Sequence, residues 1–291
     1  MKYTTLNSYL KERFGCKVYK LALDGGFTCP NRDGTLGTRG CIFCSKGGSG
    51  EFAQSRKLSI TEQLEKGKAL VENKTKDGKY IAYFQAFTNT YAPVSELRRK
   101  YYEAVEHPDT VALSIATRPD CLPDGVLELI KEINQIKPVF VELGLQSIHK
   151  KTSDYIRRGY ELEVYDKALE KLHNIGVNVV THLIIGLPGE TEKDMLESVE
   201  YVCRVTDGIK LQLLHVLEGT DLAEEYRQGR VKTLSLEEYA EIIKKCVEII
   251  PERVVIHRLT GDGAKKDLIA PLWSADKKTV LNTINKTLSS N

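Results

Sequence analysis

The sequence lacks the features of several large classes of protein. No run approaches the roughly 18 apolar residues that a membrane-spanning helix needs, and residues 1–14 lack the apolar region of a signal peptide. The formal net charge is only +2, which is too small to indicate a nucleic-acid-binding protein by electrostatics alone. Internal repeats and low-complexity segments are also missing. We therefore expect a cytoplasmic protein without membrane association, folded as a single domain over residues 1–291.

Cysteine is present but unevenly distributed. Seven cysteines, an odd number, make a disulfide framework a poor fit, and a reducing compartment with metal-binding or reactive thiols fits better. Cys203 and Cys246 fall on the apolar stripes of predicted helices, so we expect them in the core. Cys121 follows a predicted strand, and a buried, apolar role is favoured for it. Three cysteines share the stretch CPNRDGTLGTRGCIFC, from Cys29 to Cys44, which is poor in helix and strand formers.

Three thiols around one loop admit three interpretations. Cys41 and Cys44 form a CxxC pair that can direct two sulfurs at one metal, and Cys29 can join them through a glycine-rich interval. A structural zinc site needs a fourth ligand from elsewhere in the chain, whereas a redox CxxC pair leaves Cys29 without a role. An iron–sulfur cluster on three thiolates keeps one iron open to an outside ligand. We favour the last interpretation.

The hydrophobic pattern predicts parallel βα units. Apolar or alternating runs predict strands at 17–23, 80–87, 110–117, 138–146, 177–187, 208–217 and 253–259. Helical segments lie between them, two of which begin with the S-x-x-E spacing of a capping box, at Ser59 and Ser235. The predicted fold class is α/β, a parallel (β/α) partial TIM-type barrel of about six units with short terminal extensions. We place the barrel core at about 17–260 and a C-terminal extension at about 261–291.

Polar residues interrupt strands that a helix-covered barrel should keep apolar. Glu142 and Gln146 share one strand face, and Lys210 and Gln212 repeat the pattern. Some of these residues could lie at strand ends in solvent. A polar ligand in the upper barrel explains them together, and the active site of such folds lies at the C-terminal ends of the strands. The cysteine loop follows the first predicted strand, so it belongs to the same end.

Several segments together resemble the radical S-adenosylmethionine (SAM) superfamily. They are FTCPNRDGTLGTRGCIFC, YFQAFTNTYAP, LSIATRPDCLPD, VELGLQS, IIGLPGET and RLTGDG, which span about 17–263. The overall pattern is most similar to the YhcC/YtqA-type family, related to the radical SAM domain of the Elongator catalytic subunit. The interval between Cys29 and Cys41 is wider than the CxxxCxxC of most superfamily members, and it matches the longer loop of this family.

The resemblance implies two cofactors and a set of contacts. Cys29, Cys41 and Cys44 would bind a 4Fe–4S cluster whose fourth iron takes SAM, and reduction would cleave SAM to a 5′-deoxyadenosyl radical that abstracts a substrate hydrogen. The resemblance implies that Thr88 and Asn89 contact the amino group of SAM. It also implies that Gln146 and Arg158 contact SAM as a pair, in which Arg158 would bind the carboxylate. The ribose contact would be Glu142, and the adenine contact would be the backbone of Ile185, Gly186 and Leu187.

The resemblance also implies a substrate. Kinship with the Elongator radical domain points to tRNA, at the position-5 side chain of the wobble uridine, and in bacteria to a carboxymethylaminomethyl group there. An electron donor such as ferredoxin or flavodoxin is implied as a partner. Lys210 and Gln212 are candidate substrate contacts, and Lys265 and Lys266 are the basic pair best placed for phosphate. The alternatives are a radical SAM enzyme acting on a small, porphyrin-like molecule or a protein, and a zinc-stabilised binding protein without catalysis.

Overall fold

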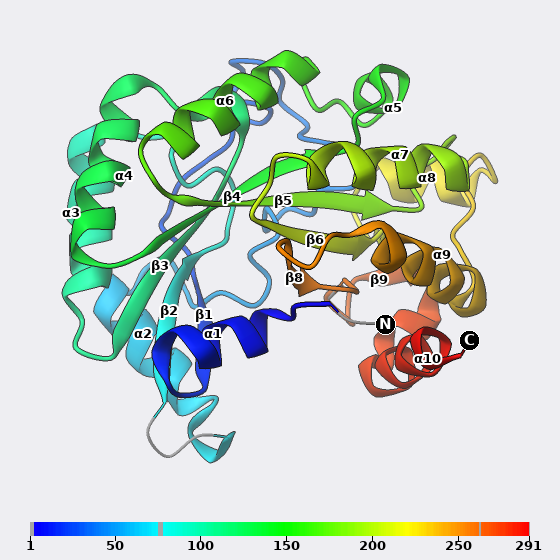
Figure 1. Ribbon diagram of the computed structural model, residues 1–291. Coiled ribbons are helices and arrows are strands. Elements are labelled where there is room, and N and C mark those ends of the chain that lie inside the picture. The colour runs from blue at the N-terminus through cyan, green and yellow to red at the C-terminus, as the bar shows by residue number, and fades with distance from the viewer. Residues whose placement is uncertain (1–2, 75–77, 262, 291) are drawn as a thin grey trace.

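The core of the protein is a curved sheet of seven parallel strands, seen in a computed structural model that describes residues 3–74, 78–261 and 263–290. The strand order is β1-β2-β3-β4-β5-β6-β8, so β1 and β8 form the two edges of an open, partial barrel (Figure 1). The strands are β1 Val18–Leu23, β2 Lys79–Phe84, β3 Thr110–Thr117, β4 Val139–Gln146, β5 Asn178–Ile185, β6 Gly208–Leu213 and β8 Val255–Arg258. The predicted fold class is confirmed.

Ten α-helices pack around the sheet in the part of the chain that the structure describes. They are α1 Leu6–Phe14, α2 Ile60–Ala69, α3 Val94–Glu106, α4 Asp124–Ile136, α5 Lys150–Tyr155, α6 Leu162–Asn174, α7 Glu192–Cys203, α8 Asp221–Arg227, α9 Leu236–Ile249 and α10 Lys277–Ser289, with 3-10 turns η1 Glu72–Lys74, η2 Pro119–Cys121 and η3 Leu272–Ala275. The capping boxes predicted at Ser59 and Ser235 begin α2 and α9. Cys203 and Cys246 are buried in the main core, as expected. No helix in the described ranges is long and apolar enough to cross a bilayer.

Two predicted strands end three or more residues earlier than the sequence pattern suggests. Phe87 has a positive φ of 61°, which is incompatible with a strand, and β2 ends at Phe84. The predicted strand 208–217 breaks after Leu213, and residues Val216–Leu217 form β7. Strand β7 pairs with β9 (Leu268–Ala270) in an antiparallel ribbon outside the main sheet. That ribbon joins the end of the barrel to the C-terminal segment, and alternation in the sequence did not predict it.

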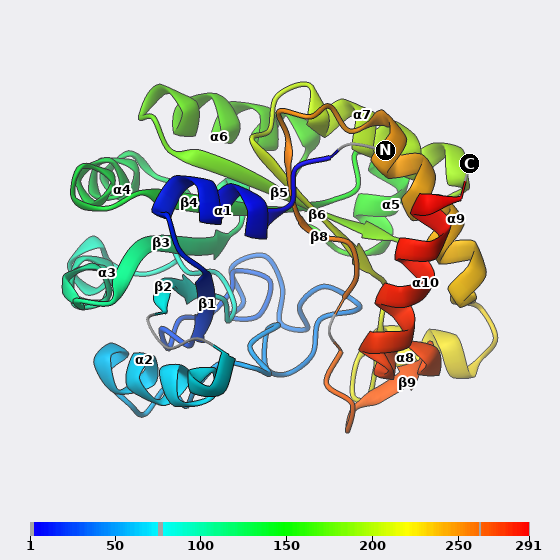
Figure 2. The ribbon, with the colours of Figure 1, turned by 60° about the horizontal axis from the view of Figure 1, so that its bottom comes forward.

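The interior of the barrel is built in layers because side chains on one face of a strand recur at every second residue. The lowest layer is apolar and packs Ile81, Ala112, Phe140 and Val180 against Leu10 of α1. Figure 2, in which the bottom of Figure 1 comes forward, shows α1 in front of the strands. Helix α1 therefore closes the N-terminal end. Two residues further along each strand the interior becomes polar, and the C-terminal end stays open.

Candidate active site

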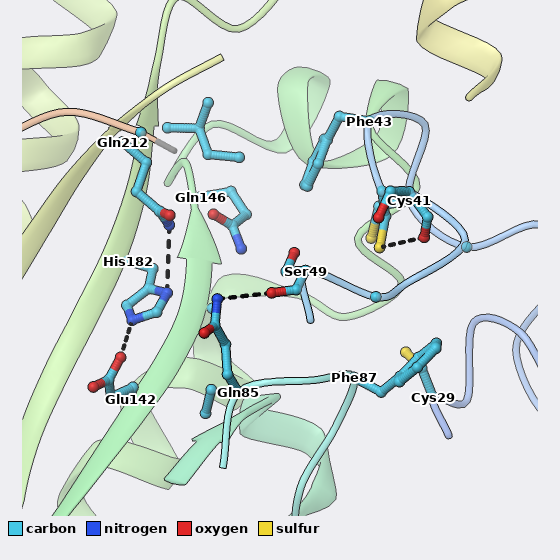
Figure 3. Close-up of a pocket in the computed structure, with 18 of the residues that line it drawn as sticks. Cys29, Cys41, Phe43, Ser49, Gln85, Phe87, Glu142, Gln146, His182 and Gln212 are labelled. Atoms are coloured by element: carbon cyan, nitrogen blue, oxygen red, sulfur yellow. Dashed lines mark hydrogen bonds and ion pairs between the residues drawn. The ribbon is translucent and has the colours of Figure 1, made fainter. Parts of the chain in front are cut away.

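A cavity of about 250 Å³ lies at the C-terminal ends of the strands. The cysteine loop forms one wall, and the ends of β3 to β6 form the other (Figure 3). Nine predicted residues line it: Cys29, Cys41, Cys44, Thr88, Glu142, Gln146, Arg158, Lys210 and Gln212. The topology therefore brings together residues that are up to 183 positions apart, from Cys29 to Gln212.

The cysteine loop is held in place by backbone hydrogen bonds. Cys44 N donates to Cys41 O at 3.0 Å, which closes the CxxC turn, and Ile42 N donates to Ile156 O at 3.2 Å. Gly40 has a φ of +75°, and an added Cβ would lie 3.0 Å from the Arg32 guanidinium. A glycine is therefore required at this position, directly before Cys41.

The spread of the three sulfurs distinguishes two of the interpretations of the loop. In the part of the chain that the structure describes, only His149, Asp194 and Glu197 place three ligand atoms within 4.8 Å of one another. The sulfurs of Cys29, Cys41 and Cys44 are therefore spread more widely. Tetrahedral zinc with Zn–S bonds of about 2.3 Å holds its sulfurs about 3.8 Å apart. A cluster of several irons and sulfides is larger than one ion, so the wider spread fits a cluster better than zinc.

The thiols lie in an environment that disfavours free thiolates. Burial raises the pKa of Cys41 to about 11, and the nearby Cys44 adds to the rise while the charge of Arg118 opposes it. Burial also raises the pKa of Cys44. Coordination to a cation reverses this preference because a ligating thiol loses its proton to the metal. The buried thiols therefore suit ligation better than an exposed redox pair.

Two of the predicted SAM contacts carry buried acceptors that are not used within the described protein. Asn89 Oδ1 and Gln146 Oε1 have no hydrogen-bond partner there, although Asn89 Nδ2 donates to Ala116 O at 2.9 Å. An unpaired buried acceptor is costly, and because Gln146 lines the cavity whereas Asn89 does not, the acceptor of Gln146 is the one that points to a ligand with hydrogen-bond donors there. Gln146 has a positive φ of 72°, and its side chain faces the cavity (Figure 3). Its Nε2 would lie 2.9 Å from a Cβ at Gly144, so glycine leaves room for it.

Arg158 is engaged in a different way from that implied by the resemblance. Its Nη1 donates to Ser147 O at 2.6 Å, and its Nε and Nη2 both donate to Tyr160 O, at 3.1 and 2.9 Å. The guanidinium also stacks on the Tyr160 ring, 4.5 Å from its centroid. These contacts brace the turn after β4. Contact of Arg158 with the SAM carboxylate stays a prediction.

Glu142 is fully buried and is shared by groups from other strands. Lys20 of β1 and Lys210 of β6 both pair with its carboxylate. Ser114 Oγ donates to Oε1 at 2.6 Å, and His182 Nε2 lies 2.7 Å from Oε2. We call Lys20, Tyr83, Ser114, Glu142, His182 and Lys210 the polar layer of the barrel. Because both carboxylate oxygens already have partners, the ribose contact predicted for Glu142 has no support in these contacts.

The polar layer changes the titration of its members. Burial raises the pKa of the Glu142 carboxyl, but the charges of Lys20 and Lys210 outweigh burial and hold that pKa well below 4.5. Burial, with the charge of Lys20, lowers the pKa of Lys210 to about 7. Burial and the charge of Lys210 lower the pKa of His182 to about 4. At neutral pH, Glu142 is therefore ionised and His182 is neutral, so His182 can donate to Glu142 from Nε2.

Other predicted residues lie away from the cavity. Ile185, Gly186 and Leu187 are not among its lining residues, whereas Ile184 is. Lys265 and Lys266 are exposed and do not line it. Gly261 and Gly263 of the TGDG segment do line it, and Asp262 between them lies outside the described residues. The adenine and phosphate contacts assigned to these segments stay predictions.

Sequence reasoning missed the contributions of Lys20 and Arg258. Lys20 interrupts the apolar strand KVYKLAL, and Arg258 ends β8 and lines the cavity. A basic residue inside a strand that helices cover was the available signal, and it applied to Lys20 as it did to Lys210. His182 lies between Gln212 and Glu142, with its Nδ1 3.4 Å from Gln212 Nε2 (Figure 3).

Comparison with known proteins defines the class. The family model of the Radical SAM superfamily matches residues 34–202, and the model of the Radical_SAM C-terminal domain matches residues 206–290. The protein YtqA of Bacillus subtilis is 46% identical over 288 residues, which cover 99% of this chain and 89% of YtqA. The chain belongs to the radical SAM superfamily. The resemblance to the YhcC/YtqA-type family is thereby confirmed.

Other relatives match a part of the chain or share its fold. A tRNA uridine(34) acetyltransferase of Methanocaldococcus jannaschii is 35% identical over 174 residues, which cover 57% of this chain and 31% of that protein. The structure of the Elp3 protein of Methanocaldococcus infernus aligns with a TM-score of 0.65 and 20% identity, covering 92% of this chain and 63% of Elp3. That structural likeness shows a shared fold.

Membership implies a 4Fe–4S cluster and SAM as cofactors. The described residues fit both groups, because three half-buried cysteines line the cavity and the unused acceptor of Gln146 lies on its lining. Cys29, Cys41 and Cys44 would hold the cluster, and Gln146 with the segment Thr88–Asn89 would bind SAM. When bound, a reduced cluster supplies the electron that cleaves SAM to a 5′-deoxyadenosyl radical.

Proposed function

We propose that this radical SAM enzyme modifies the position-5 side chain of the wobble uridine of tRNA. The observation that carries the proposal is the 35% identity with a tRNA uridine(34) acetyltransferase over 174 residues, which cover 57% of this chain. This chain covers 31% of that relative, so acetyl transfer itself is not proposed. We propose that the two proteins share the step in which a radical attacks the substrate.

The charge of the cavity favours a substrate group with a negative charge. Its lining includes five basic side chains, Arg32, Arg118, Arg158, Lys210 and Arg258, and two acidic ones, Glu51 and Glu142. A cavity of one predominant charge attracts and stabilises a ligand group of the opposite charge. A carboxymethylaminomethyl group ends in a carboxylate, so we propose that this group enters the cavity. Lys210 and Gln212 are the substrate contacts that line it.

Each part of the cavity has a role in this proposal. The cysteine wall carries the cluster, Gln146 and Thr88 orient SAM, and the polar layer at the opposite side holds the substrate group (Figure 3). A small electron carrier such as ferredoxin or flavodoxin reduces the cluster. Holding the reacting groups side by side in one cavity favours their reaction over side reactions of the radical.

Nucleoside mass spectrometry of tRNA tests the substrate. We expect a strain without this gene to accumulate the carboxymethylaminomethyl form at the wobble uridine and to lose the nucleosides that derive from it. Complementation with the intact gene should restore the pattern, and complementation with the Cys29→Ala variant should not. Unchanged wobble uridines in the deletion strain would reject the tRNA proposal and favour a small-molecule or protein substrate.

A further inference from the structure

Asn31 connects the cysteine loop to a turn that is distant in the sequence. It lies two residues after Cys29 and is only 5% exposed. Its Nδ2 donates to Arg157 O at 2.8 Å and lies 3.3 Å from Arg158 O. Because carbonyl oxygens only accept, these contacts determine which end of the amide is the NH₂ group. The amide therefore has a fixed orientation.

The same NH₂ group faces one of the cluster cysteines. Asn31 Nδ2 lies 3.4 Å from Cys41 Sγ, within hydrogen-bonding range of sulfur. An amide nitrogen carries two hydrogens, so one can bind the carbonyl of Arg157 while the other is directed at the sulfur. Metal-bound Cys41 is a thiolate, which accepts and does not donate. The N–H of Asn31 is therefore the donor in this contact.

The surrounding backbone holds Asn31 in this position. Gly40 N donates to Asn31 O at 2.7 Å, which ties its main chain to the residue before Cys41. On the other side, a Cβ at Gly159 would lie 3.0 Å from Asn31 Oδ1, so the glycine leaves room for the amide. The contact with Cys41 therefore follows from the way the loop as a whole is folded.

We propose that Asn31 is a positioning residue that donates a hydrogen bond to the Cys41 thiolate and raises the reduction potential of the 4Fe–4S cluster. The inference rests on the cluster part of the proposed function and is independent of the tRNA part. Reduction adds negative charge that spreads onto the cluster sulfurs and thiolates. A fixed N–H donor stabilises the reduced form more than the oxidised form, and hydrogen bonds to sulfur are one of the factors that set such potentials.

A redox titration followed by electron paramagnetic resonance tests the inference on anaerobically reconstituted protein. In Asn31→Ala we expect the equilibrium constant for reduction to fall threefold to tenfold, a shift of about 28 to 59 mV to lower potential for a one-electron couple. Iron content should stay near that of the wild type. Pulsed resonance in D₂O should also show one exchangeable hydrogen fewer near the reduced cluster.

Two further variants separate tuning from loop structure. Asp33→Ala changes the same loop, where the Asp33 side chain accepts from Thr35 N at 3.0 Å and has no described contact with a cysteine, so the potential of this variant should match the wild type. Asn31→Ser keeps one donor and should give an intermediate potential. Wild-type potentials in both Asn31 variants, or failure of both to bind iron, would overturn the inference. A wild-type protein that binds zinc and no cluster would instead reject the proposed function.

Discussion

Lys210 on β6 and Glu142 on β4 form a buried ion pair across the interior of the barrel, with β5 between their strands. Lys20 on the edge strand β1 pairs with the other oxygen of the same carboxylate. One carboxylate thus connects strands from both halves of the curved sheet. The arrangement lies between the apolar layer that α1 closes and the cavity above.

The stability of the protein should depend strongly on Glu142. Glu142→Gln leaves Lys20 and Lys210 buried without their counter-charge, and breaking such a group typically costs about 3 to 5 kcal/mol. Urea unfolding at neutral pH should show this decrease in the free energy of unfolding. Glu163→Gln, at an exposed position of α6, should change it by less than about 0.5 kcal/mol. Equal stabilities of the two variants would contradict the role of the ion pair.

Acid should destabilise the protein partly through His182. Its pKa in the folded protein is about 4, below its ordinary value of 6.5, so the unfolded chain binds more protons between these values. Stability therefore rises with pH across this interval, by up to about 3 kcal/mol. In His182→Asn this part of the pH dependence should disappear, while the fall caused by protonation of Glu142 at lower pH should persist. If the free energy of unfolding changes with pH in the same way for both proteins from about pH 4 to 7, His182 does not cause this pH dependence.

Cluster binding should depend on the three cysteines of the loop. Anaerobically reconstituted wild-type protein should show a broad absorbance near about 400 nm that bleaches on reduction, and it should form 5′-deoxyadenosine with dithionite. The Cys29→Ser variant should form at least about 100-fold less 5′-deoxyadenosine than the wild type, because formation of the radical needs the cluster. Cys16→Ser, a half-buried cysteine outside the cavity lining, serves as the matched control. A colourless wild type that retains zinc would support the structural alternative.

SAM affinity should depend on Gln146. Gln146→Leu removes the buried acceptor that has no partner within the described protein, and loss of a hydrogen bond to a charged ligand group weakens binding by about tenfold or more. Equilibrium dialysis with the reconstituted protein measures the dissociation constant. Gln135→Leu, on the exposed surface of α4, should leave it unchanged. An unaltered affinity in Gln146→Leu would remove Gln146 from the SAM site.

Lys265 and Lys266 should act on tRNA through its phosphates. In a double variant with Lys265→Ala and Lys266→Ala, the logarithm of the tRNA binding constant should depend less steeply on the logarithm of the salt concentration. The slope should decrease in magnitude by about 1 to 2. The matched variant Lys167→Ala, Lys171→Ala changes two exposed lysines of α6 and should leave the slope as it is. If the two double variants bind tRNA with identical salt dependence, Lys265 and Lys266 do not contact its phosphates.

The sequence determined the fold class and one wall of the site. Apolar or alternating runs located all seven strands of the main sheet, because the burial of a strand leaves a pattern among residues that are neighbours along the chain. It also predicted that the cysteine loop after β1 would share one end of the barrel with Gln146 and Lys210. Chain order alone settles this, since the carboxyl ends of parallel strands meet at one edge.

Only the tertiary structure decided what those residues contact. The shared carboxylate of Glu142 joins Lys20 to Lys210, which are 190 positions apart, and strand alternation cannot show which inward side chains meet. Arg158 is engaged by carbonyls of a turn whose shape the sequence does not show. Asn31, which the motif left without a role, reaches Cys41 because the loop folds back against residues 157–158. Such contacts depend on how distant segments pack, and packing is a property of the whole fold.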